Sequence, residues 1–167
     1  MKLIQPSKDM EKHFIDMAID YKMANESRYQ IAFEENFNFS EYIEKLSKDS
    51  KEEHLKPGYV PSTTFWLIDN HGKILGTSRL RHYLVPHLEK EGGHIGYDVP
   101  PTERMKGYGT ILLKYTLEKA KEMGIEEVLI TCDTDNVGSA KIIVNNGGIF
   151  ENEIISNESG KQVSRYW

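Results

Sequence analysis

Cysteine is almost absent from this sequence, which has Cys132 alone among 167 residues. An internal disulfide is therefore excluded. Long apolar runs are also missing. No stretch approaches the roughly 20 residues of a membrane-spanning helix, and the N-terminus has neither the apolar core of a signal peptide nor an arginine-rich transit segment. We expect a soluble protein of the cytoplasm, without a membrane partner.

No charge of one sign dominates. The chain has 21 Lys and Arg against 26 Asp and Glu, a net charge of −5, and acidic groupings such as Glu34-Glu35 and Glu126-Glu127 are scattered. A basic face is not apparent, so nucleic acid is not expected as a partner. A mild acidic balance would suit a cationic acceptor such as an amine, although ordinary solubility accounts for it as well. The composition shows no break, so we expect one domain over residues 1–167, and a homodimer remains open.

Metal ligands with a recognisable spacing are lacking too. His82 and His87 stand in a region expected to be a loop, without further ligands around them. Surface histidines are the simpler interpretation, and no metal is expected. Cys132 could carry an acyl group as a nucleophile, but it ends an apolar stretch and has no histidine near it in sequence. A core position is the simpler interpretation for this thiol.

Apolar alternation and turn signals predict seven strands. The turn Asp69-Asn70-His71-Gly72 joins two of them into an antiparallel hairpin, and the turn Asn157-Glu158-Ser159-Gly160 joins the last two. The predicted strands are 2–5, 63–69, 73–84, 94–99, 128–132, 149–155 and 162–167.

Four helices are predicted from residues at helical spacing and from their end signals. The first follows Pro6-Ser7, the second runs from Ser40 as N-cap to Leu46, the third ends at Gly124, and the fourth spans 137–146. The inward residues are expected to be Met10, Phe14, Met17, Ala18 and Tyr21 in the first, Leu113, Leu117 and Ala120 in the third, and Ala140, Ile143 and Val144 in the fourth.

Residues 97–115 are the most informative stretch. Pro100 and Pro101 end a strand because neither can donate to a ladder, and a loop with Gly107 and Gly109 then leads into a helix. Such a junction leaves several backbone N–H groups unpaired at the positive end of a helix dipole, where an anion with many oxygens can bind. A phosphate-bearing cofactor is therefore expected.

Two other phosphate-binding signatures fail on the same residues. A P-loop needs a lysine after its last glycine, but Gly109 is followed by Thr110. A dinucleotide fingerprint needs a third glycine at the position of Leu112. The sequence therefore favours neither ATP nor NAD.

The pattern that fits is Val-x-Pro-x-x-Arg-x-x-Gly-x-Gly, formed by Val99, Pro101, Arg104, Gly107 and Gly109. It resembles the acyl-CoA pyrophosphate loop of the GNAT N-acetyltransferase superfamily. The chain also resembles that superfamily's second motif, at Asp135-Asn136, Ser139-Ala140 and Asn146-Gly147-Gly148. The resemblance covers residues 72–150, and the remainder matches by the order of its elements.

The resemblance implies an α/β protein with the GNAT acyl-CoA N-acyltransferase fold, a central mixed sheet of about seven strands flanked by about four helices. It also implies acetyl-CoA as cosubstrate. In this superfamily the strand before the loop parts from the strand after the next helix, and the V-shaped slot between them takes the pantetheine arm. Pro100 supplies a physical reason for the parting here.

The cofactor-contacting residues are likewise implied by the resemblance. Val99 would pair with pantetheine through its backbone, Asn136 takes the place of an asparagine that contacts the cofactor arm, and Ser139 lies one helical turn further on. Asn136 and Ser139 could equally be helix caps. Glycines would let the backbone approach the pyrophosphate, and a tight turn without ligand is the alternative. The loop residues expected around the pyrophosphate are Arg104, Met105, Lys106, Gly107, Tyr108, Gly109 and Thr110.

Two residues are candidates for catalysis. By the resemblance, the backbone amide of Tyr97, on the same side of its strand as Val99, would polarise the thioester carbonyl. His94 is the candidate general base, because an imidazole has a pKa suited to removing a proton from an ammonium. A structural histidine at the start of a strand is the alternative.

The sequence departs from the superfamily pattern at two positions. Ile143 stands where many members have a tyrosine that protonates the departing thiolate, and Tyr166 is a candidate substitute. Gly93 stands where the histone-acetylating branch has a glutamate. These departures keep open a non-catalytic acyl-CoA-binding sensor as an alternative function.

The expected function is transfer of an acetyl group from acetyl-CoA to a primary amine by direct attack. The acceptor would be a small molecule or a peptide. The aromatic and acidic segment 26–42 is expected to form the wall on the acceptor side, since the superfamily usually builds that wall from the corresponding region.

Overall fold

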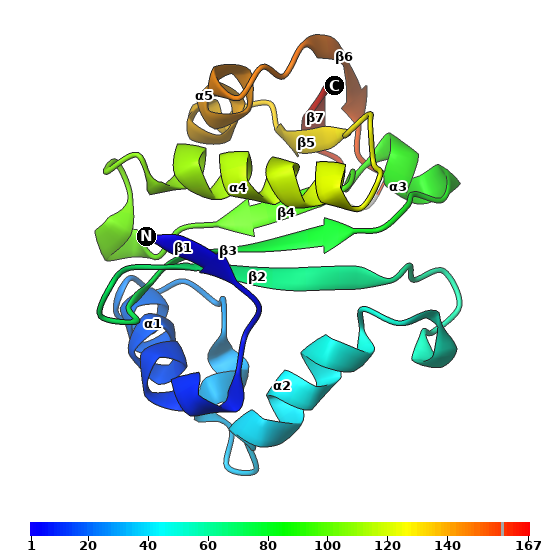
Figure 1. Cartoon of the computed structure of the whole chain (residues 1–167). Helices are drawn as coiled ribbons and strands as arrows, with labels where there is room; N and C mark the ends of the chain where they lie inside the picture. The colour runs from blue at the N-terminus through cyan, green and yellow to red at the C-terminus, as the bar shows by residue number, and fades with distance from the viewer. Residues whose placement is uncertain (158) are drawn as a thin grey trace.

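The computed structural model describes residues 1–157 and 159–167, and the backbone alone of residue 54. Within those residues the chain forms seven strands and five α-helices (Figure 1). The strands are β1 (Lys2–Ile4), β2 (Ser62–Ile68), β3 (Ile74–Arg81), β4 (Ile95–Asp98), β5 (Ile130–Asp133), β6 (Phe150–Ile155) and β7 (Gln162–Tyr166). The helices are α1 (Glu11–Met23), α2 (Phe39–Lys48), α3 (Pro86–Lys90), α4 (Tyr108–Glu122) and α5 (Val137–Asn145).

The strands form two antiparallel sheets rather than one continuous ladder. One sheet has the order β1-β2-β3-β4 and the other has the order β5-β7-β6. They meet just before β4 and β5 begin, where the His94 amide donates to the Leu129 carbonyl over 2.7 Å. From this contact onward β4 and β5 belong to different sheets, and we call the place where the two strands part the slot. The expected α/β class and the expected parting of the two strands are both confirmed.

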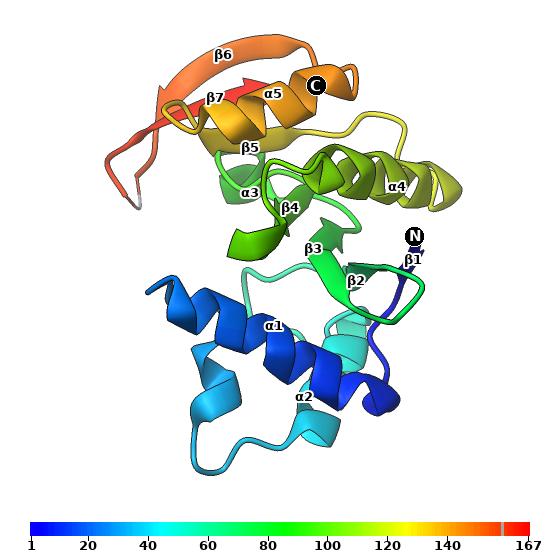
Figure 2. The same ribbon diagram turned by 90° about the vertical axis from the view of Figure 1, so that its left-hand side faces the viewer.

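Helices cover both faces of the four-stranded sheet. Figures 1 and 2 show α1 and α2 on one side and α4 on the other. On β2, Trp66 and Ile68 join the core cluster of α1 and α2, whereas Phe65 and Leu67 join the clusters of α4. Successive side chains of a strand point to opposite faces, so a strand covered on both faces needs a continuous apolar run.

Most elements lie within three residues of their predicted bounds, but two predicted details are wrong. The N-cap of α2 is Asn38, whose Oδ1 accepts from the Glu41 amide at 3.2 Å, and not Ser40. Val144 was expected to face inward and is 56% exposed, because α5 turns Ile142 and Ile143 toward the core instead.

Two further differences concern short segments. The sequence does not predict α3, since a helix of five residues is too short to show a period. The turn expected at 157–160 contains Glu158, which lies outside the described residues. β6 and β7 on either side of it pair as an antiparallel hairpin, as expected.

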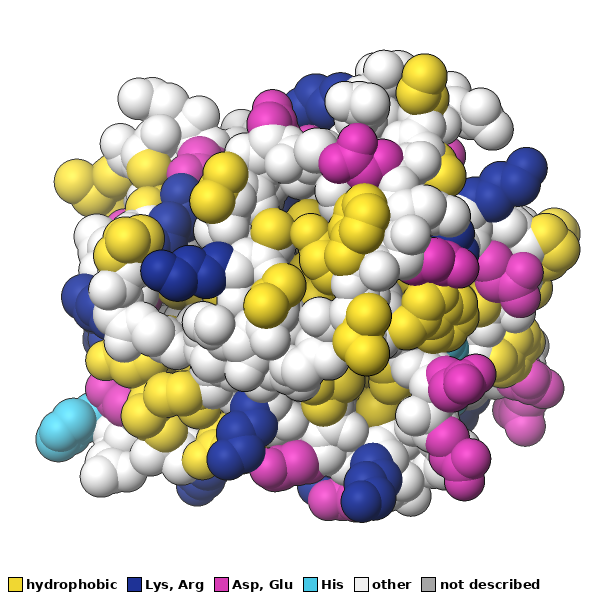
Figure 3. All heavy atoms as spheres, turned by 90° about the horizontal axis from the view of Figure 1, so that it is seen from above, with side chains coloured by type: hydrophobic (Ala, Val, Ile, Leu, Met, Phe, Trp, Pro, Cys, Tyr) yellow, Lys and Arg dark blue, Asp and Glu magenta, His cyan; other side chains and the backbone are white. Residues whose placement is uncertain are grey.

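The surface above the three-stranded sheet carries mixed charge. Figure 3, which views the molecule from above, shows Lys and Arg interspersed with Asp and Glu around exposed apolar side chains. The apolar residues exposed at this end of the fold include Val137, Val144, Ile149, Phe150 and Trp167.

Candidate functional site

The slot begins at a very close approach of two backbones. A Cβ added to Gly93 would lie 2.4 Å from the Leu129 carbonyl oxygen, and Gly93 has φ of +57°. Any side chain at this position would push β4 away from β5. The glycine found in place of the glutamate of the histone-acetylating branch therefore has a structural reason.

His94 joins the two strands at the same point. Its side chain is buried, and its Nδ1 accepts a hydrogen bond from the Leu129 amide at 3.0 Å. Burial, and then the charge of Arg81, lower the pKa of His94, so the imidazole is neutral at neutral pH. These contacts give His94 a structural role, while its action as a general base stays a prediction.

The direction of the peptide groups along β4 follows from one hydrogen bond. The Arg81 amide donates to the His94 carbonyl over 2.8 Å, so the next N–H, that of Ile95, points away from β3. Peptide directions alternate along a strand, and the N–H groups of Tyr97 and Val99 therefore also point away from β3, toward the slot. This is the orientation that the roles expected for Tyr97 and Val99 require.

The loop before α4 presents a row of unpaired donors. The backbone N–H groups of residues 105–109 donate to no acceptor within the described part of the chain. Met105 has φ of +60° and a fully exposed side chain, and Gly107 has φ of +83° at the N-cap of α4. Consecutive N–H groups brought together by left-handed residues at a helix N-terminus form an anion-binding concavity. The strained Met105 has no packing role that explains its conformation, which points to a ligand.

The basic side chains of the loop are held by carboxylates. Arg104 donates to both oxygens of Glu26 at 2.7 and 2.8 Å, and its Nε donates to the Val99 carbonyl at 3.0 Å. Lys106 lies 3.0 Å from Glu103, which also pairs with Lys73. Arg104 and Lys106 therefore order the loop. The backbone N–H groups of the loop are the hydrogen-bond donors that stay available to an anion.

Gly109 serves helix packing, whereas the sequence predicted that it lets the backbone approach the pyrophosphate. A Cβ there would lie 2.6 Å from Cδ1 of Ile142 in α5 and 3.6 Å from Cγ2 of Val99. By contrast, a Cβ on Gly107 would meet nothing within 4 Å. Space for a ligand is thus open at Gly107, whereas Gly109 lets α4 and α5 come together. The Thr110 carbonyl strengthens that contact by accepting from Asn146 at 3.2 Å.

Asn136 and Ser139 are joined by a capping bond. The Asn136 Oδ1 accepts from the Ser139 amide at 3.0 Å, so Asn136 is the N-cap of α5. The Ser139 carbonyl accepts from the Tyr97 hydroxyl at 3.2 Å, and burial raises the pKa of Tyr97 to about 12. The capping role is observed, and cofactor contact through the remaining polar atoms stays a prediction.

A buried isoleucine occupies position 143, where many superfamily members have a tyrosine. Ile143 is 1% exposed and lies in the core cluster with Leu113 and Ile130. Tyr166 is buried in the same cluster, with its ring packed edge-on against Phe150. A proton-donating role for Tyr166 therefore stays a prediction.

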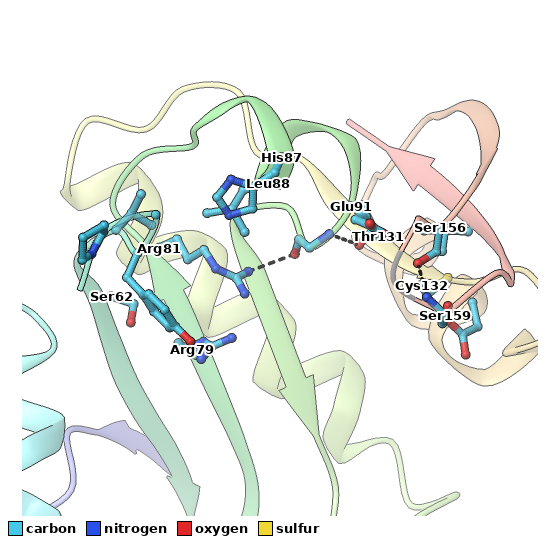
Figure 4. A pocket seen from close by; sticks show the side chains of 17 residues that line it. Ser62, Arg79, Arg81, His87, Leu88, Glu91, Thr131, Cys132, Ser156 and Ser159 are labelled. Carbon is cyan, nitrogen blue, oxygen red and sulfur yellow. Dashed lines mark hydrogen bonds between the residues drawn. The ribbon is translucent and has the colours of Figure 1, made fainter. Parts of the chain in front are cut away.

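A cavity of about 670 Å³ lies over β3 and β5 on the face opposite α4 (Figure 4). Ser78 and Leu80 of β3 pack toward α4. Successive side chains of a strand point to opposite faces, so Arg79 and Arg81 point into this cavity. Its other lining residues include Tyr59, Ser62, Glu91, Thr131, Cys132 and Asp133. This site was not predicted from the sequence, although two arginines separated by a single residue on a strand indicate a shared face.

The segment expected to form the acceptor wall does not line this cavity. Tyr29 and Phe37 pack around Phe14 at ring-centroid distances of 5.9 Å, and Phe39 is buried in the same cluster. Glu26 is held by Arg104. The aromatic part of segment 26–42 therefore builds the core beneath the sheet.

The described residues contain no group of three or more His, Cys, Asp or Glu side chains able to hold a metal ion. His82 instead contacts the Thr63 hydroxyl at 2.9 Å. In the part of the chain that the structure describes, no helix is long and apolar enough to cross a membrane.

Three solved structures illustrate the similarity of the whole fold. The microcin C7 self-immunity acetyltransferase MccE, in complex with acetyl-CoA and AMP, superposes with a TM-score of 0.67 at 17% identity, covering 98% of this chain and 89% of that one. Spermidine N-acetyltransferase from Vibrio cholerae, in complex with CoA and spermine, gives 0.64 at 13% identity, with coverages of 99% and 92%. Ribosomal-protein-S5-alanine acetyltransferase from Vibrio fischeri gives 0.63 at 16% identity, with coverages of 99% and 89%.

The sequence comparisons address the family itself. No curated protein matches this chain. The model of the acetyltransferase (GNAT) family matches residues 24–143, which include the loop before α4, the slot and most of α5. The element order and the fold agree with that match. The chain therefore belongs to the GNAT family of acetyltransferases.

Proposed function

We propose that this protein transfers an acetyl group from acetyl-CoA to the primary amine of a small molecule or peptide. The observation that carries the proposal is the row of unpaired N–H groups at 105–109, placed beside the slot between β4 and β5. A pyrophosphate on these amides and a pantetheine arm in the slot would use both features together. Two of the similar structures hold CoA or acetyl-CoA, which supports the choice of cosubstrate.

The proposed cofactor contacts are mainly backbone contacts. The N–H groups of residues 105–109 would hold the pyrophosphate, and the Val99 backbone would pair with pantetheine. Arg104 and Lys106 would act mainly by ordering the loop, because both are held by carboxylates. Asn136 has its Nδ2 left for the cofactor arm, since its Oδ1 caps α5.

The proposed reaction is a direct attack on the thioester. The unprotonated amine nitrogen adds to the carbonyl carbon, and the carbonyl oxygen takes up the negative charge facing the Tyr97 N–H. The carbon–sulfur bond then breaks, the amide forms, and the nitrogen loses its proton to a base. Ile143 can donate no proton, so CoA would leave as a thiolate that solvent protonates. Positioning would supply most of the rate enhancement.

The alternative is a sensor that binds acyl-CoA without chemistry. The buried Ile143 and the absence of a side chain at Gly93 favour it, because neither position offers an acid or a base. The Tyr97 amide and the slot favour the enzyme, since direct attack needs only a positioned amine and a polarised carbonyl.

Release of free thiol separates these two functions. The protein would be incubated with acetyl-CoA and a panel of primary amines, and free CoA would be detected with a thiol reagent. If the protein is an acetyltransferase, we expect thiol release that depends both on the amine and on the protein. Binding of acetyl-CoA by calorimetry without thiol release from any amine would instead establish the sensor.

A further inference from the structure

The cavity over β3 and β5 holds two positive charges without a carboxylate partner. The Arg79 side chain is exposed, and it forms no hydrogen bond or ion pair with the residues that the structure describes. The Arg81 Nη1 donates to the carbonyls of Gly92 and Gly93 at 3.0 and 2.7 Å, which leaves its charge uncompensated. Burial, and then the charge of Arg79, lower the pKa of Arg81 to about 10, so the Arg81 side chain remains cationic at neutral pH. Figure 4 shows the two guanidinium groups together on one side of the cavity.

Carboxylates lie on another side of the same cavity. Glu91 follows α3 beside Thr131, and Asp133 ends β5. Asp133 meets Lys161 at 3.3 Å across an exposed contact, and Glu91 forms no ion pair among the described residues. The cavity therefore separates positive charge on β3 from negative charge near β5.

The arginine side of the cavity adjoins the proposed reaction site. Arg79 pairs in register with Gly96 of β4, and a Cβ on Gly96 would meet nothing within 4 Å. The peptide that follows Gly96 carries the Tyr97 N–H, which points to the slot. A group bound on Arg79 would thus lie one strand away from the thioester carbonyl.

We propose that the acceptor is a small amine that also carries a carboxylate, with the carboxylate on Arg79 and Arg81 and the amine toward the slot and the acidic side. This substrate class rests on the proposed acetyl transfer. A planar guanidinium binds a carboxylate through two parallel hydrogen bonds, which suits an amino acid or a similar amino-carboxylate. A polyamine would place positive charge against two arginines, an arrangement that disfavours binding. A cavity of about 670 Å³ has the size of a small-molecule site.

Matched amines that differ by one carboxylate test this proposal. Acetyl-CoA-dependent thiol release would be measured with ornithine against putrescine and with tyrosine against tyramine. O-phosphoethanolamine against ethanolamine would show whether phosphate can replace carboxylate. We expect the carboxylated amine of at least one carboxylate pair to have a kcat/KM about tenfold higher or more, the effect of one charge-assisted hydrogen bond.

Variants of Arg79 assign the preference to the cavity. Arg79→Gln should remove most of the preference by raising KM for the carboxylated amine, and Arg79→Lys should retain part of it. Lys12→Gln removes the same charge from an exposed ion pair on α1 and should change nothing. Better turnover of the amines that lack a carboxylate, or a carboxylate preference unchanged by Arg79→Gln, would overturn the proposal.

Binding measurements keep this inference separate from the proposed chemistry. Calorimetry with CoA present would follow ornithine and tyrosine binding to the wild type and to Arg79→Gln. Amine binding that depends on Arg79, without any acetylation, would support the anion site and contradict the proposed acetyl transfer. Acetylation of amines without Arg79-dependent binding would contradict the anion site alone. If neither acetylation nor Arg79-dependent binding were found, the anion site and the acetyl transfer would both be contradicted.

Discussion

Gly107 is the residue whose backbone shape matters most for the proposed cofactor site. With φ of +83° at the N-cap of α4, it sets the direction of the N–H groups on either side of it. Gly107→Val would force a β-branched residue into a left-handed conformation, at a cost of roughly 1–2 kcal/mol. The loop would escape this strain by changing shape, so we expect calorimetry to give an acetyl-CoA affinity at least about tenfold weaker.

Gly124 offers a matched control for this variant. It has φ of +79° beyond the other end of α4, and a Cβ there would also meet nothing within 4 Å. Gly124→Val should therefore lower the free energy of unfolding by a similar amount without changing acetyl-CoA affinity. Equal loss of affinity in both variants would mean that general destabilisation, and not the loop, accounts for the effect.

His94 should make stability depend on pH. Its pKa is lowered in the folded protein from an ordinary 6.5, so the folded state binds a proton less readily than the unfolded state. Stability is then lost as pH falls below about 6.5, because protonation favours unfolding. His94→Asn keeps an acceptor for the Leu129 amide but does not titrate. Chemical denaturation would give the free energy of unfolding of both proteins between pH 5 and 8. This free energy should fall less steeply toward acid pH in the variant, and equal slopes in the two proteins would be evidence against this role.

The same variant tests the catalytic hypothesis for His94. A general base contributes roughly a hundredfold or more to the rate. If His94 were that base, His94→Asn would lower kcat by that amount and leave the acetyl-CoA affinity unchanged. The buried side chain with its occupied Nδ1 predicts the smaller effect, a loss of only a few-fold. A loss near a hundredfold, partly restored at high pH, would instead establish His94 as the base.

At the scale of elements, the contact between β4 and β5 decides whether the slot exists. Gly93→Ala would place a methyl group against the Leu129 carbonyl, where 2.4 Å leaves no room. We expect a loss of about 1–3 kcal/mol in the free energy of unfolding, together with weaker acetyl-CoA binding. Gly96→Ala, three residues further on in β4, places its methyl group in open space and should cost little stability by comparison. Denaturant titration of both variants checks the difference, and equal stabilities would show that the two strands can separate freely.

Elements defined by local signals were predictable, and those defined by packing were not. The proline pair after β4 and the glycines before α4 predicted the junction correctly, because proline and glycine each determine the conformation of the backbone at their own position. The reason for Gly109 was missed, since it depends on Ile142 in another helix. The N-cap at Asn38 was missed because Ser40 nearby is an equally good capping type.

At the scale of the whole molecule, the fold followed from the order of elements, whereas the cavity over β3 and β5 did not. The cavity is lined by segments that lie far apart in the sequence, from Pro57 to Val163, and no local pattern joins them. The net charge of −5 suits a cationic acceptor or ordinary solubility alike, and it does not predict that two arginines line one cavity. Total charge is a property of the surface, and a site is decided by the few charges that converge on it.

Calorimetric titration of the wild-type protein with acetyl-CoA, CoA, ATP and NAD tests the central claim most directly. The slot and the free N–H groups of residues 105–109 are proposed to hold an acyl-CoA, and the loop lacks the lysine of a P-loop and the third glycine of a dinucleotide site. The account predicts one site that binds acetyl-CoA and CoA at least about a hundredfold more tightly than ATP or NAD. Preferred binding of ATP or NAD, or no binding of acetyl-CoA, would contradict it.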